Sequence, residues 1–585
     1  MEKHYTDEKA IQVVIALLKA HGIRKVIASP GTTNITLVAS LQYDPYFEIY
    51  SSIDERSAAY IACGLAAESG ESVVLSCTGA TASRNYLPGL TEAYYRKLPV
   101  LAITSTQIIN RVKHNVSQVI DRSSMPNDVV KLSVTSPVIK DDDDLWECEV
   151  KVNEAILELT RHGGGPAHIN LPTVFSRAFD TKELPKVQVI KRITLADDFP
   201  ELPDGKIAVF VGAHAVMSDS ETKAIDMFCA SNDAVVFCDH TSGYRGKYRV
   251  QYALVAGQDA LDLADHSPDL LVHIGQTSGD YYSIRLAGKQ VGKQVWRVNR
   301  DGEIRDTFRK LSYIFEMPEQ SFFEYYAKHC GNNIDNYLHF CKTQLEELRA
   351  KIQELPFSNL WIASKMAHRI PEGSVIHLGI LNSLRTWNLF ELPSSVKSAS
   401  NVGGFGIDGN ISSLLGASLA NKNILYFGII GDLATFYDLN ALGNRYVGKN
   451  LRILVVNNGK GTEFKMYNNL AYNFGEDADK YIAAAGHFGN KSTLLLRHYA
   501  EDLGFEYLHA SSKQEFESVY ERFLTAKITE RPMLFEVFTN DTEECVALKE
   551  VRNINKGDDR SKAKWFAKKV LGEKGIRVVK KVLGK

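Results

Sequence analysis

The sequence contains no apolar run of about 18 residues, the length that a helix needs to cross a bilayer. Its first residues, MEKHYTDEKAIQVVIALLKAHG, lack the apolar core and the cleavage site of a signal peptide. The eight cysteines include no Cys-x-x-Cys pair, so neither a disulfide framework nor a zinc site is predicted. A formal net charge of −2 argues against general nucleic-acid binding. These absences predict a cytoplasmic protein of ordinary composition.

The sequence is rich in short apolar runs that alternate with helical patterns. Examples are KVIASPG, SVVLSCTG, PVLAITS, KIAVFVGAH, AVVFCDH, LLVHIGQ, SVIHLG, ILYFGIIGD and LRILVVNNG. This rhythm is typical of βα units that build parallel sheets, and 585 residues suffice for about three or four domains. We therefore predict an α/β fold with three doubly wound parallel-sheet domains. The predicted bounds are residues 1–180, 190–345 and 356–548, followed by a basic tail at 557–585.

Two of the predicted strands in the third domain end in polar residues of a particular kind. ILYFGII ends at Gly431-Asp432-Leu433, and LRILVV ends at Asn457-Asn458-Gly459. The distance between these ends in the chain allows one helical crossover, so both would lie at the same edge of a parallel sheet. A carboxylate and an amide oxygen there are hard ligands of the kind that Mg²⁺ prefers. A helix cap and a turn would explain either half alone, whereas the pair favours a site for Mg²⁺ and a diphosphate.

A second pattern lies in the first domain, where Glu55 opens a helix of small and apolar residues, DERSAAYIACGLA. The small residues predict a dry environment for the carboxyl group, which would raise its pKa and suit it to proton transfer. The alternative is an ordinary acidic residue that stabilises the helix dipole.

These segments resemble the thiamine-diphosphate-dependent decarboxylases and carboligases, a family that includes acetolactate synthase and pyruvate decarboxylase, and in particular its menaquinone-pathway carboligase branch. The resemblance covers the first and third domains. It is carried by Ser29-Pro30-Gly31, DERSAAYIACGLA, CTGATASRNYLPGLTEAYYRKLPVLAIT, SQVID, GFGIDGNISSLLGASLA and GDLATFYDLNAL. It implies a pyrimidine-binding, a central and a diphosphate-binding domain, in that order.

The resemblance also implies roles for individual residues. Glu55 would activate the cofactor, Asp432 and Asn458 would bind Mg²⁺ together with the carbonyl of Lys460, and Ile407 would be the wedge that bends the cofactor. Gln118 would face the cofactor, although an exposed loop amide fits it nearly as well. The remaining residues expected to contact thiamine diphosphate are Gly31, Thr78, Gly406, Gly431 and Leu433. No FAD is expected. A homodimer is the minimum active unit that the resemblance implies, since the two halves of each site come from different subunits.

The substrate-binding residues depart from the menaquinone-pathway pattern. Thr33 and Val402 stand where arginines would bind polycarboxylate substrates, and a further such arginine is replaced within Ser105-Thr106-Gln107. Arg385 is a candidate for binding a donor carboxylate, or forms a surface salt bridge. Glu463, followed by Phe464, is a candidate acid/base group, or lies in a solvated loop. Thr33, Arg385 and Phe464 are thus the candidate substrate residues, and the substitutions favour a less anionic, more hydroxyl-rich acceptor.

The sequence therefore predicts a carboligase that decarboxylates a 2-oxo acid and passes the acyl unit to an acceptor. The expected acceptor is a sugar or another polyhydroxyl compound rather than isochorismate. A simple decarboxylase that releases an aldehyde, and a non-catalytic scaffold, are the alternatives. Between Arg560 and Lys585 ten basic residues stand against one acid, Glu573, interleaved with apolar residues. Such a tail could lie on an anionic membrane surface, at the inner face, or dock on an acidic protein partner; the alternative, which the sequence leaves open, is a frayed end on the chain's own acidic surface.

Overall fold

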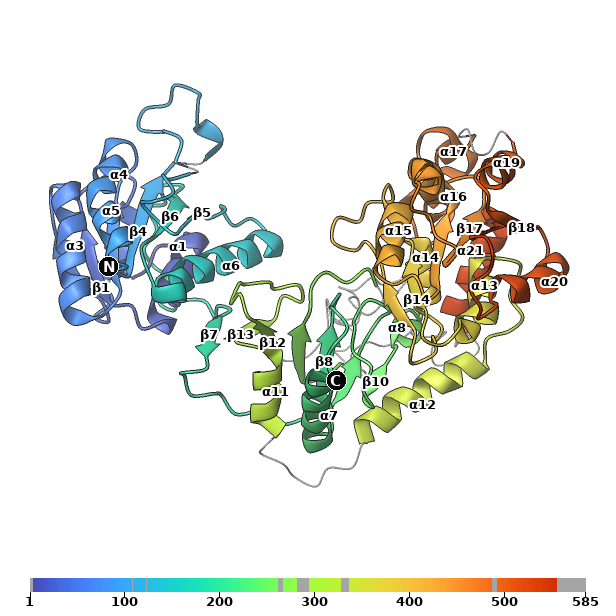
Figure 1. The fold of residues 1–585 in the computed structure, drawn as a ribbon. Helices are drawn as coiled ribbons and strands as arrows, with labels where there is room; N and C mark the ends of the chain where they lie inside the picture. The colour runs from blue at the N-terminus through green and yellow to red at the C-terminus, as the bar shows by residue number, and fades with distance from the viewer. Residues whose placement is uncertain are drawn as a thin grey trace, which may run out of the picture. The chain divides into compact units, whose positions relative to one another are not determined.

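The fold was analysed in a computed structural model, which describes residues 4–107, 109–122, 124–260, 267–280, 294–327, 336–486 and 492–554 (Figure 1). The chain divides into two compact units. The first comprises Met1–Phe199 with Asn299–Met317, and the second comprises Pro200–Val298 with Pro318–Lys585.

The first unit contains a six-stranded parallel sheet with the strand order β2-β1-β3-β4-β6-β5. Its strands are β1 (Lys25–Ala28), β2 (Glu48–Ser51), β3 (Val73–Cys77), β4 (Val100–Thr106), β5 (Leu132–Thr135) and β6 (Ala167–Pro172). The helices between them are α1 (Lys9–Ala20), α2 (Ile35–Gln42), α3 (Glu55–Ser69), α4 (Thr81–Asn85), α5 (Leu87–Tyr95) and α6 (Asp142–Glu158).

Helices cover both faces of this sheet, because the strands are apolar on both sides. Val74 of β3 packs into one core with residues of α1, α2 and α6, whereas its neighbours Val73 and Leu75 pack into another with residues of α3 and α5. Successive side chains of a strand point to opposite faces, so continuous apolar runs of this kind produce a three-layered α/β domain.

A second parallel sheet has the order β10-β9-β8-β11-β12 within the second unit. The strands are β8 (Ile207–Val211), β9 (Val235–Phe237), β10 (Arg249–Val250), β11 (Leu270–Ile274) and β12 (Gln294–Asn299), with helices α7 (Asp219–Asn232), α8 (Ala253–Ala256), α11 (Glu319–Ala327) and α12 (Asn336–Ala350). In the first unit, β7 (Lys191–Thr194) and β13 (Leu311–Glu316) form a parallel pair.

The third sheet is six-stranded and parallel, with the order β15-β14-β16-β17-β19-β18. Its strands are β14 (Val375–Leu378), β15 (Lys397–Ala399), β16 (Tyr426–Gly431), β17 (Leu451–Asn457), β18 (Glu506–Ala510) and β19 (Met533–Phe538). The helices are α13 (Asn359–Met366), α14 (Asn382–Trp387), α15 (Asn410–Ala420), α16 (Asp432–Tyr437), α17 (Ala478–Tyr481), α19 (Leu495–Asp502), α20 (Lys513–Phe523) and α21 (Asp541–Arg552), with a 3-10 turn, η5, at Thr462–Lys465.

Both faces of the third sheet are covered as well. Ile430 and Ile453 pack into an aliphatic core with residues of α15 and α19. On β19, Phe535 stacks on Phe516 of α20, with ring centroids 5.3 Å apart. These three parallel sheets confirm the predicted fold class, while the exact domain bounds remain predictions.

Two further features bear on the sequence-based expectations. In the described part of the chain, none of the helices combines the length and the apolar character needed to cross a bilayer. The basic tail at 557–585 lies outside the described residues, so the expectations attached to it remain predictions.

Candidate active site

Asp432 and Asn458 follow neighbouring strands of the third sheet. β16 and β17 are parallel, with Gly431 opposite Val456, so both strands end at the same edge. Asp432 is the first residue of α16, and its Oδ2 accepts a hydrogen bond from the backbone amide of Gly459 at 3.0 Å. Gly459 has φ +80°, a left-handed conformation that glycine adopts without strain. The turn after β17 is thereby held against the start of α16.

The Asp432 carboxyl group is buried, with 2% of its surface exposed. Burial raises its pKa to about 7, and the charge of Glu536 adds to the increase, while hydrogen bonds from backbone amides oppose it. Glu536 of β19 is buried too and accepts hydrogen bonds from Asn457 and from Tyr507, each at 2.7 Å. Two buried carboxyl groups at one sheet edge form an electronegative site, which a bound cation would stabilise.

The residues at this edge fit a magnesium ion. Oδ1 of Asn458 is buried and has no hydrogen-bond partner among the described residues, so an oxygen ligand there is available. The backbone carbonyl of Lys460 accepts a hydrogen bond from the Thr462 hydroxyl at 3.3 Å. The Lys460 side chain forms ion pairs with Asp479 and Asp541. The described residues hold no group of three or more histidine, cysteine or acidic side chains suited to a metal, so this site would depend on amide and carbonyl oxygens as well as Asp432.

Gly406 and Ile407, predicted beneath the cofactor, precede α15. The Ile407 side chain is half-buried and packs against the aliphatic core under that helix. Its backbone carbonyl accepts a hydrogen bond from the Asn410 side chain at 2.9 Å. Leu433, expected to contact the cofactor, is half-buried in the first turn of α16. The core thus restricts the position of the Ile407 side chain, which its predicted contact with the cofactor requires.

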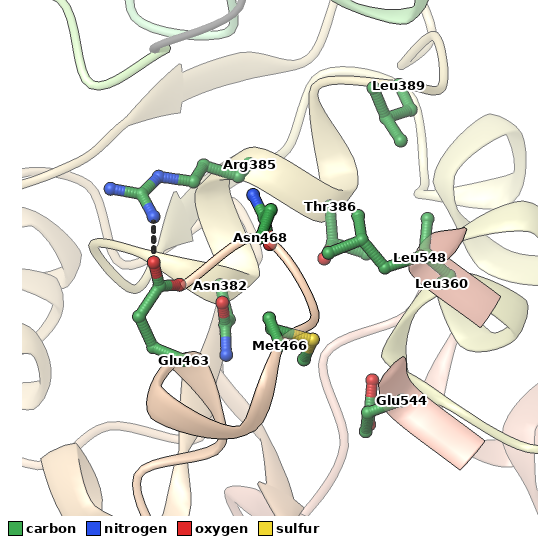
Figure 2. Close-up of a pocket in the computed structure, with 10 residues that line it drawn as sticks. All are labelled: Leu360, Asn382, Arg385, Thr386, Leu389, Glu463, Met466, Asn468, Glu544 and Leu548. Carbon is green, nitrogen blue, oxygen red and sulfur yellow. Dashed lines mark hydrogen bonds and ion pairs between the residues drawn. The ribbon is translucent and has the colours of Figure 1, made fainter. Parts of the chain in front are cut away.

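Arg385 and Glu463, predicted separately, form an ion pair. Nη1 of Arg385 on α14 donates to Oε1 of Glu463 on η5 at 2.6 Å, and both side chains line one pocket (Figure 2). With its amide in the orientation that satisfies both groups, Asn382 donates to the other carboxylate oxygen and accepts from the Glu463 backbone amide. The two residues form a salt bridge whose side chains are 11% and 25% exposed, and a substrate or acid/base role for either stays a prediction.

The rest of that pocket is mostly apolar. Its wall consists of Leu360, Leu389, Met466 and Leu548, together with Thr386, Asn468 and Glu544. Glu544 accepts hydrogen bonds from the Asn359 amide at 2.9 Å and the Thr539 hydroxyl at 2.8 Å, and burial raises its pKa to about 7. Phe464, the other candidate substrate residue of this segment, is 38% exposed. The lining of the pocket thus combines an ion pair and other polar groups with several apolar side chains, as small-molecule sites commonly do.

In the first unit, Gly31, Thr33 and Thr78 cluster at the carboxyl ends of β1 and β3. A Cβ atom at Gly31 would lie 2.5 Å from the Thr78 Cβ, so only glycine allows these segments to approach so closely. The Thr33 hydroxyl is buried and hydrogen-bonds to the Thr78 hydroxyl at 2.5 Å and to the Ser105 carbonyl at 2.8 Å. These bonds give Thr33 a structural function, and its substrate role stays a prediction.

Glu55 is the first residue of α3, after the N-cap Asp54, whose side chain accepts a hydrogen bond from the Ser57 amide. A single chain leaves Glu55 half-buried, so the predicted dry environment requires another surface to cover it. Gln118 lies in the segment between β4 and β5, with φ +63° and an exposed side chain. Its position is that of a loop amide, and a contact with the cofactor stays a prediction.

Sequence reasoning missed Glu536 and Asn382. Asn382 stands in the segment LNSLR beside Arg385, but its contact with Glu463 joins residues far apart in the chain. Glu536 lies within the apolar run MLFEVF, and one acidic residue in such a run was the available signal.

Residues 8–125 match the family model described as thiamine pyrophosphate enzyme, N-terminal TPP binding domain. The 2-succinyl-5-enolpyruvyl-6-hydroxy-3-cyclohexene-1-carboxylate synthase of Bacteroides fragilis is 31% identical over 93% of this chain and 99% of its own. The synthase of the same name from Bacteroides thetaiotaomicron is 32% identical over 93% and 98%.

Among solved structures, a Rhodococcus jostii RHA1 thiamine diphosphate-dependent 4-hydroxybenzoylformate decarboxylase is 17% identical, with a TM-score of 0.38, over 91% of this chain and 99% of its own. The identity to the Bacteroides synthases extends over almost the whole of both chains, including all three parallel-sheet regions. The chain therefore belongs to the family of thiamine pyrophosphate enzymes.

Proposed function

We propose that the chain catalyses decarboxylation of a 2-oxo acid with thiamine diphosphate and Mg²⁺, and transfers the acyl unit to an acceptor. The observation that carries this proposal is the edge formed by β16 and β17, where the Asp432 carboxyl and the unpartnered Asn458 Oδ1 stand together. Asp432, Asn458 and the Lys460 carbonyl would hold Mg²⁺, and the metal would hold the diphosphate.

When bound, thiamine diphosphate supplies the electron sink that makes loss of CO₂ from a 2-oxo acid feasible. The residues of this chain do the rest. Ile407, which packs against the hydrophobic core, would support the cofactor. Glu55 would hold a proton for exchange with the cofactor. Glu463, held by Arg385 and Asn382, donates or accepts a proton at the substrate.

The acceptor in this proposal is a polyhydroxyl compound rather than a polycarboxylate. Thr33 provides no guanidinium group, and the Arg385 guanidinium is already neutralised by Glu463 at 2.6 Å. A substrate carboxylate would have to compete with Glu463 for the Arg385 guanidinium. A substrate hydroxyl group can instead form hydrogen bonds with atoms of the pair that face the pocket. This feature distinguishes the proposal from the reaction in the names of the Bacteroides relatives.

The proposed active unit is a homodimer in which Glu55 of one subunit and Asp432 of the other serve the same cofactor. Large apolar side chains are exposed beside Glu55, namely Tyr50, Ile53, Tyr60 and Ile61, with Ile53 84% exposed. Others are exposed in the segment that follows η5, namely Leu470, Tyr472, Phe474 and Tyr481. Exposed apolar groups of this size support contact with another protein surface.

Mass spectrometry of products across paired 2-oxo acids and acceptors tests the proposal. A new carbon–carbon bond in the product, dependent on thiamine diphosphate, Mg²⁺ and an acceptor, is expected. Free aldehyde under every condition would identify a simple decarboxylase. No CO₂ release from any 2-oxo acid, although the cofactor binds, would favour a non-catalytic scaffold.

The basic tail carries a separate proposal, that it holds the protein at an anionic membrane surface. Its composition between Arg560 and Lys585 supports this, and an acidic protein partner is the alternative. Flotation with anionic liposomes is expected to be stronger for the full chain than for a chain that ends at Gly557. Equal flotation would rule out the membrane, leaving a partner or a tail that rests on the chain itself.

A further inference from the structure

Glu544 of α21 is a buried acidic residue that none of the roles above uses. It lines the same pocket as the Arg385–Glu463 pair, and 5% of its surface is exposed (Figure 2). Its Oε1 accepts two hydrogen bonds, from the Asn359 amide at 2.9 Å and from the Thr539 hydroxyl at 2.8 Å. Within the described part of the chain, no hydrogen bond reaches its Oε2. Oε2 is therefore the oxygen that remains for a group in the pocket.

The Glu544 carboxyl group can hold a proton near neutral pH. Burial raises its pKa to about 7, and the charge of Glu543 adds to the increase, whereas the hydrogen bonds from Asn359 and Thr539 oppose it. Because Oε1 already accepts two hydrogen bonds, the proton of the neutral acid lies on Oε2. Oε2 then donates to a ligand oxygen, and in the ionised form it accepts a hydrogen bond from a ligand hydroxyl. A hydroxyl group fits both forms.

The pocket is apolar beside Glu544. Leu548 follows Glu544 by one turn of α21, and Leu360 follows Asn359, whose amide binds the carboxyl group; both leucines line the pocket. Figure 2 shows the ion pair well apart from Glu544. A buried water molecule is held best by two to four polar partners, which this side of the pocket does not favour. A ligand with an aliphatic chain and a polar end would satisfy the leucines and Oε2 together.

The size of the pocket limits the group that can reach Glu544. The cavity volume is about 30 Å³. One water molecule needs about 10–15 Å³, so about two non-hydrogen atoms can enter. A hydroxymethyl group has that size, whereas a phosphate group or a ring is too large. A carboxylate is disfavoured by charge, because the Arg385 guanidinium is paired with Glu463 and a second anion would be repelled by ionised Glu544.

The pocket also connects Glu544 with the proposed reaction. Glu463, the proposed acid/base residue, lines the same cavity. A substrate that reacts beside Glu463 would therefore place the rest of its chain along the leucines, with the end of the chain at Glu544. The residue that recognises the end of a substrate chain decides which chains are accepted.

We propose that Glu544 is a specificity-determining residue whose Oε2 forms a hydrogen bond with a terminal hydroxyl group of the substrate. This rests on the proposed function and names its substrate class, a short chain that is aliphatic beside Leu360 and Leu548 and ends in a hydroxymethyl group. That group belongs either to the 2-oxo acid donor or to the acceptor.

Calorimetry on the full chain distinguishes these two sources. The protein is loaded with Mg²⁺ and 3-deazathiamine diphosphate, an unreactive cofactor analogue, so that binding is measured without turnover. The donor arm compares 5-hydroxy-2-oxopentanoate with 2-oxohexanoate, in which a methyl group replaces the terminal hydroxyl. The acceptor arm compares D-erythrose with 4-deoxy-D-erythrose, in which a hydrogen atom replaces it. The arm that responds identifies the source of the hydroxymethyl group.

Four variants separate recognition by Oε2 from a structural role of Glu544. Glu544→Met removes both carboxyl oxygens, whereas Glu544→Gln keeps an acceptor at Oε1 and puts an amide donor in the place of Oε2. Thr539→Val is the matched control, because it removes one hydrogen bond to Oε1 and leaves Oε2 intact. Leu548→Phe fills the cavity while Glu544 stays in place, so it tests the proposal even if Glu544→Met does not fold.

In one arm, the wild type is expected to prefer the hydroxylated probe by roughly 5- to 50-fold. Thr539→Val should keep this preference, and Glu544→Gln should stay within about threefold of it. Glu544→Met and Leu548→Phe should reduce the preference to less than about twofold. A purely structural role would instead make Thr539→Val resemble Glu544→Met and would leave the preference unchanged in Leu548→Phe.

Titration of the analogue itself, on the same samples, separates this proposal from the proposed function. Unchanged analogue affinity shows that a variant is folded. The proposal is overturned if the wild type shows no preference in either arm, if folded Glu544→Met or Leu548→Phe keeps it, or if Thr539→Val loses it. Failure of the wild type to bind the analogue contradicts the proposed function; thermal shifts of cofactor-free protein with the same four probes then test Glu544 by itself.

Discussion

Oδ2 of Asp432 accepts a hydrogen bond from the backbone amide of Gly459 at 3.0 Å, which joins the start of α16 to the turn after β17. This bond fixes the distance between the two strand ends before any ligand arrives. Oδ1 of the neighbouring Asn458 is buried and has no hydrogen-bond partner in the described part of the chain. The sheet edge at β16 and β17 thus holds oxygen atoms in fixed positions, and one of them lacks a hydrogen-bond donor. A metal site requires such an arrangement.

Replacement of Asp432 by asparagine is expected to stabilise the metal-free protein at high pH. The folded-state pKa of about 7 exceeds the ordinary value of 3.8, so the wild type loses stability as the pH rises from about 4 to 7. An amide has no such penalty. In EDTA, the melting temperature of Asp432→Asn minus that of the wild type should increase between pH 5.5 and 8.5, by about 2–6 °C. Other buried acids, such as Glu544, titrate in both proteins, so their contributions to this difference cancel. A melting-temperature difference that does not change with pH would contradict the raised pKa of Asp432.

Glu463→Gln is expected to bind anionic 2-oxo acids several-fold more tightly and to turn over at least about tenfold more slowly. The change removes the negative charge that faces Arg385, so a substrate carboxylate meets less competition, while the proton-transfer group is lost. Substrate affinity is measured with the unreactive cofactor analogue, and turnover by CO₂ release. Arg385→Met is the complementary variant and should weaken anion binding. Unchanged turnover in Glu463→Gln would remove this residue from the mechanism.

Ile407→Ala should reduce turnover by more than about tenfold while it costs about 1–2 kcal/mol of stability, because the side chain is half-buried and supports the cofactor. Ile424→Ala is the matched control, since Ile424 is also a half-buried isoleucine on the same core, two residues before β16 begins. Both variants should melt at similar temperatures, and only Ile407→Ala should be slow. Equal turnover in the two variants would show that Ile407 is an ordinary core residue.

Glu55→Gln and Asp432→Asn should each be inactive alone and complement each other when their subunits are mixed by co-expression. If one site uses Glu55 of one subunit and Asp432 of the other, a mixed dimer contains one intact site and one doubly altered site. Random association of equal amounts should then restore roughly a quarter of the wild-type activity. Mixing after separate purification, without exchange of subunits, is the control. Absence of any recovery in verified mixed dimers would place both residues in the same chain's site.

Much of the fold could be predicted because its central strands are long apolar runs. ILYFGIIGD and LRILVVNNG form β16 and β17, and the two strands end at the same sheet edge, as their polar ends predicted. The edge strands β2 and β18 could not be predicted in the same way. Their sequences, EIYS and EYLHA, are half-exposed, because one side of an edge strand has no neighbour, and they lack the apolar signal.

The site could be predicted only where its residues are close in the sequence or adjoin a strand end. The Arg385–Glu463 pair joins residues 78 positions apart, and neither alone indicates the other. The surroundings of Glu55 depend on a surface beyond the single chain.

Calorimetric titration of purified protein with thiamine diphosphate, with and without Mg²⁺, tests the central claim most directly. The wild type should bind the cofactor in the presence of Mg²⁺, and EDTA should weaken binding by at least about a hundredfold. Asp432→Asn should respond little to Mg²⁺. Wild-type protein that takes up no cofactor, or binds it equally well in EDTA and in Asp432→Asn, would contradict the account.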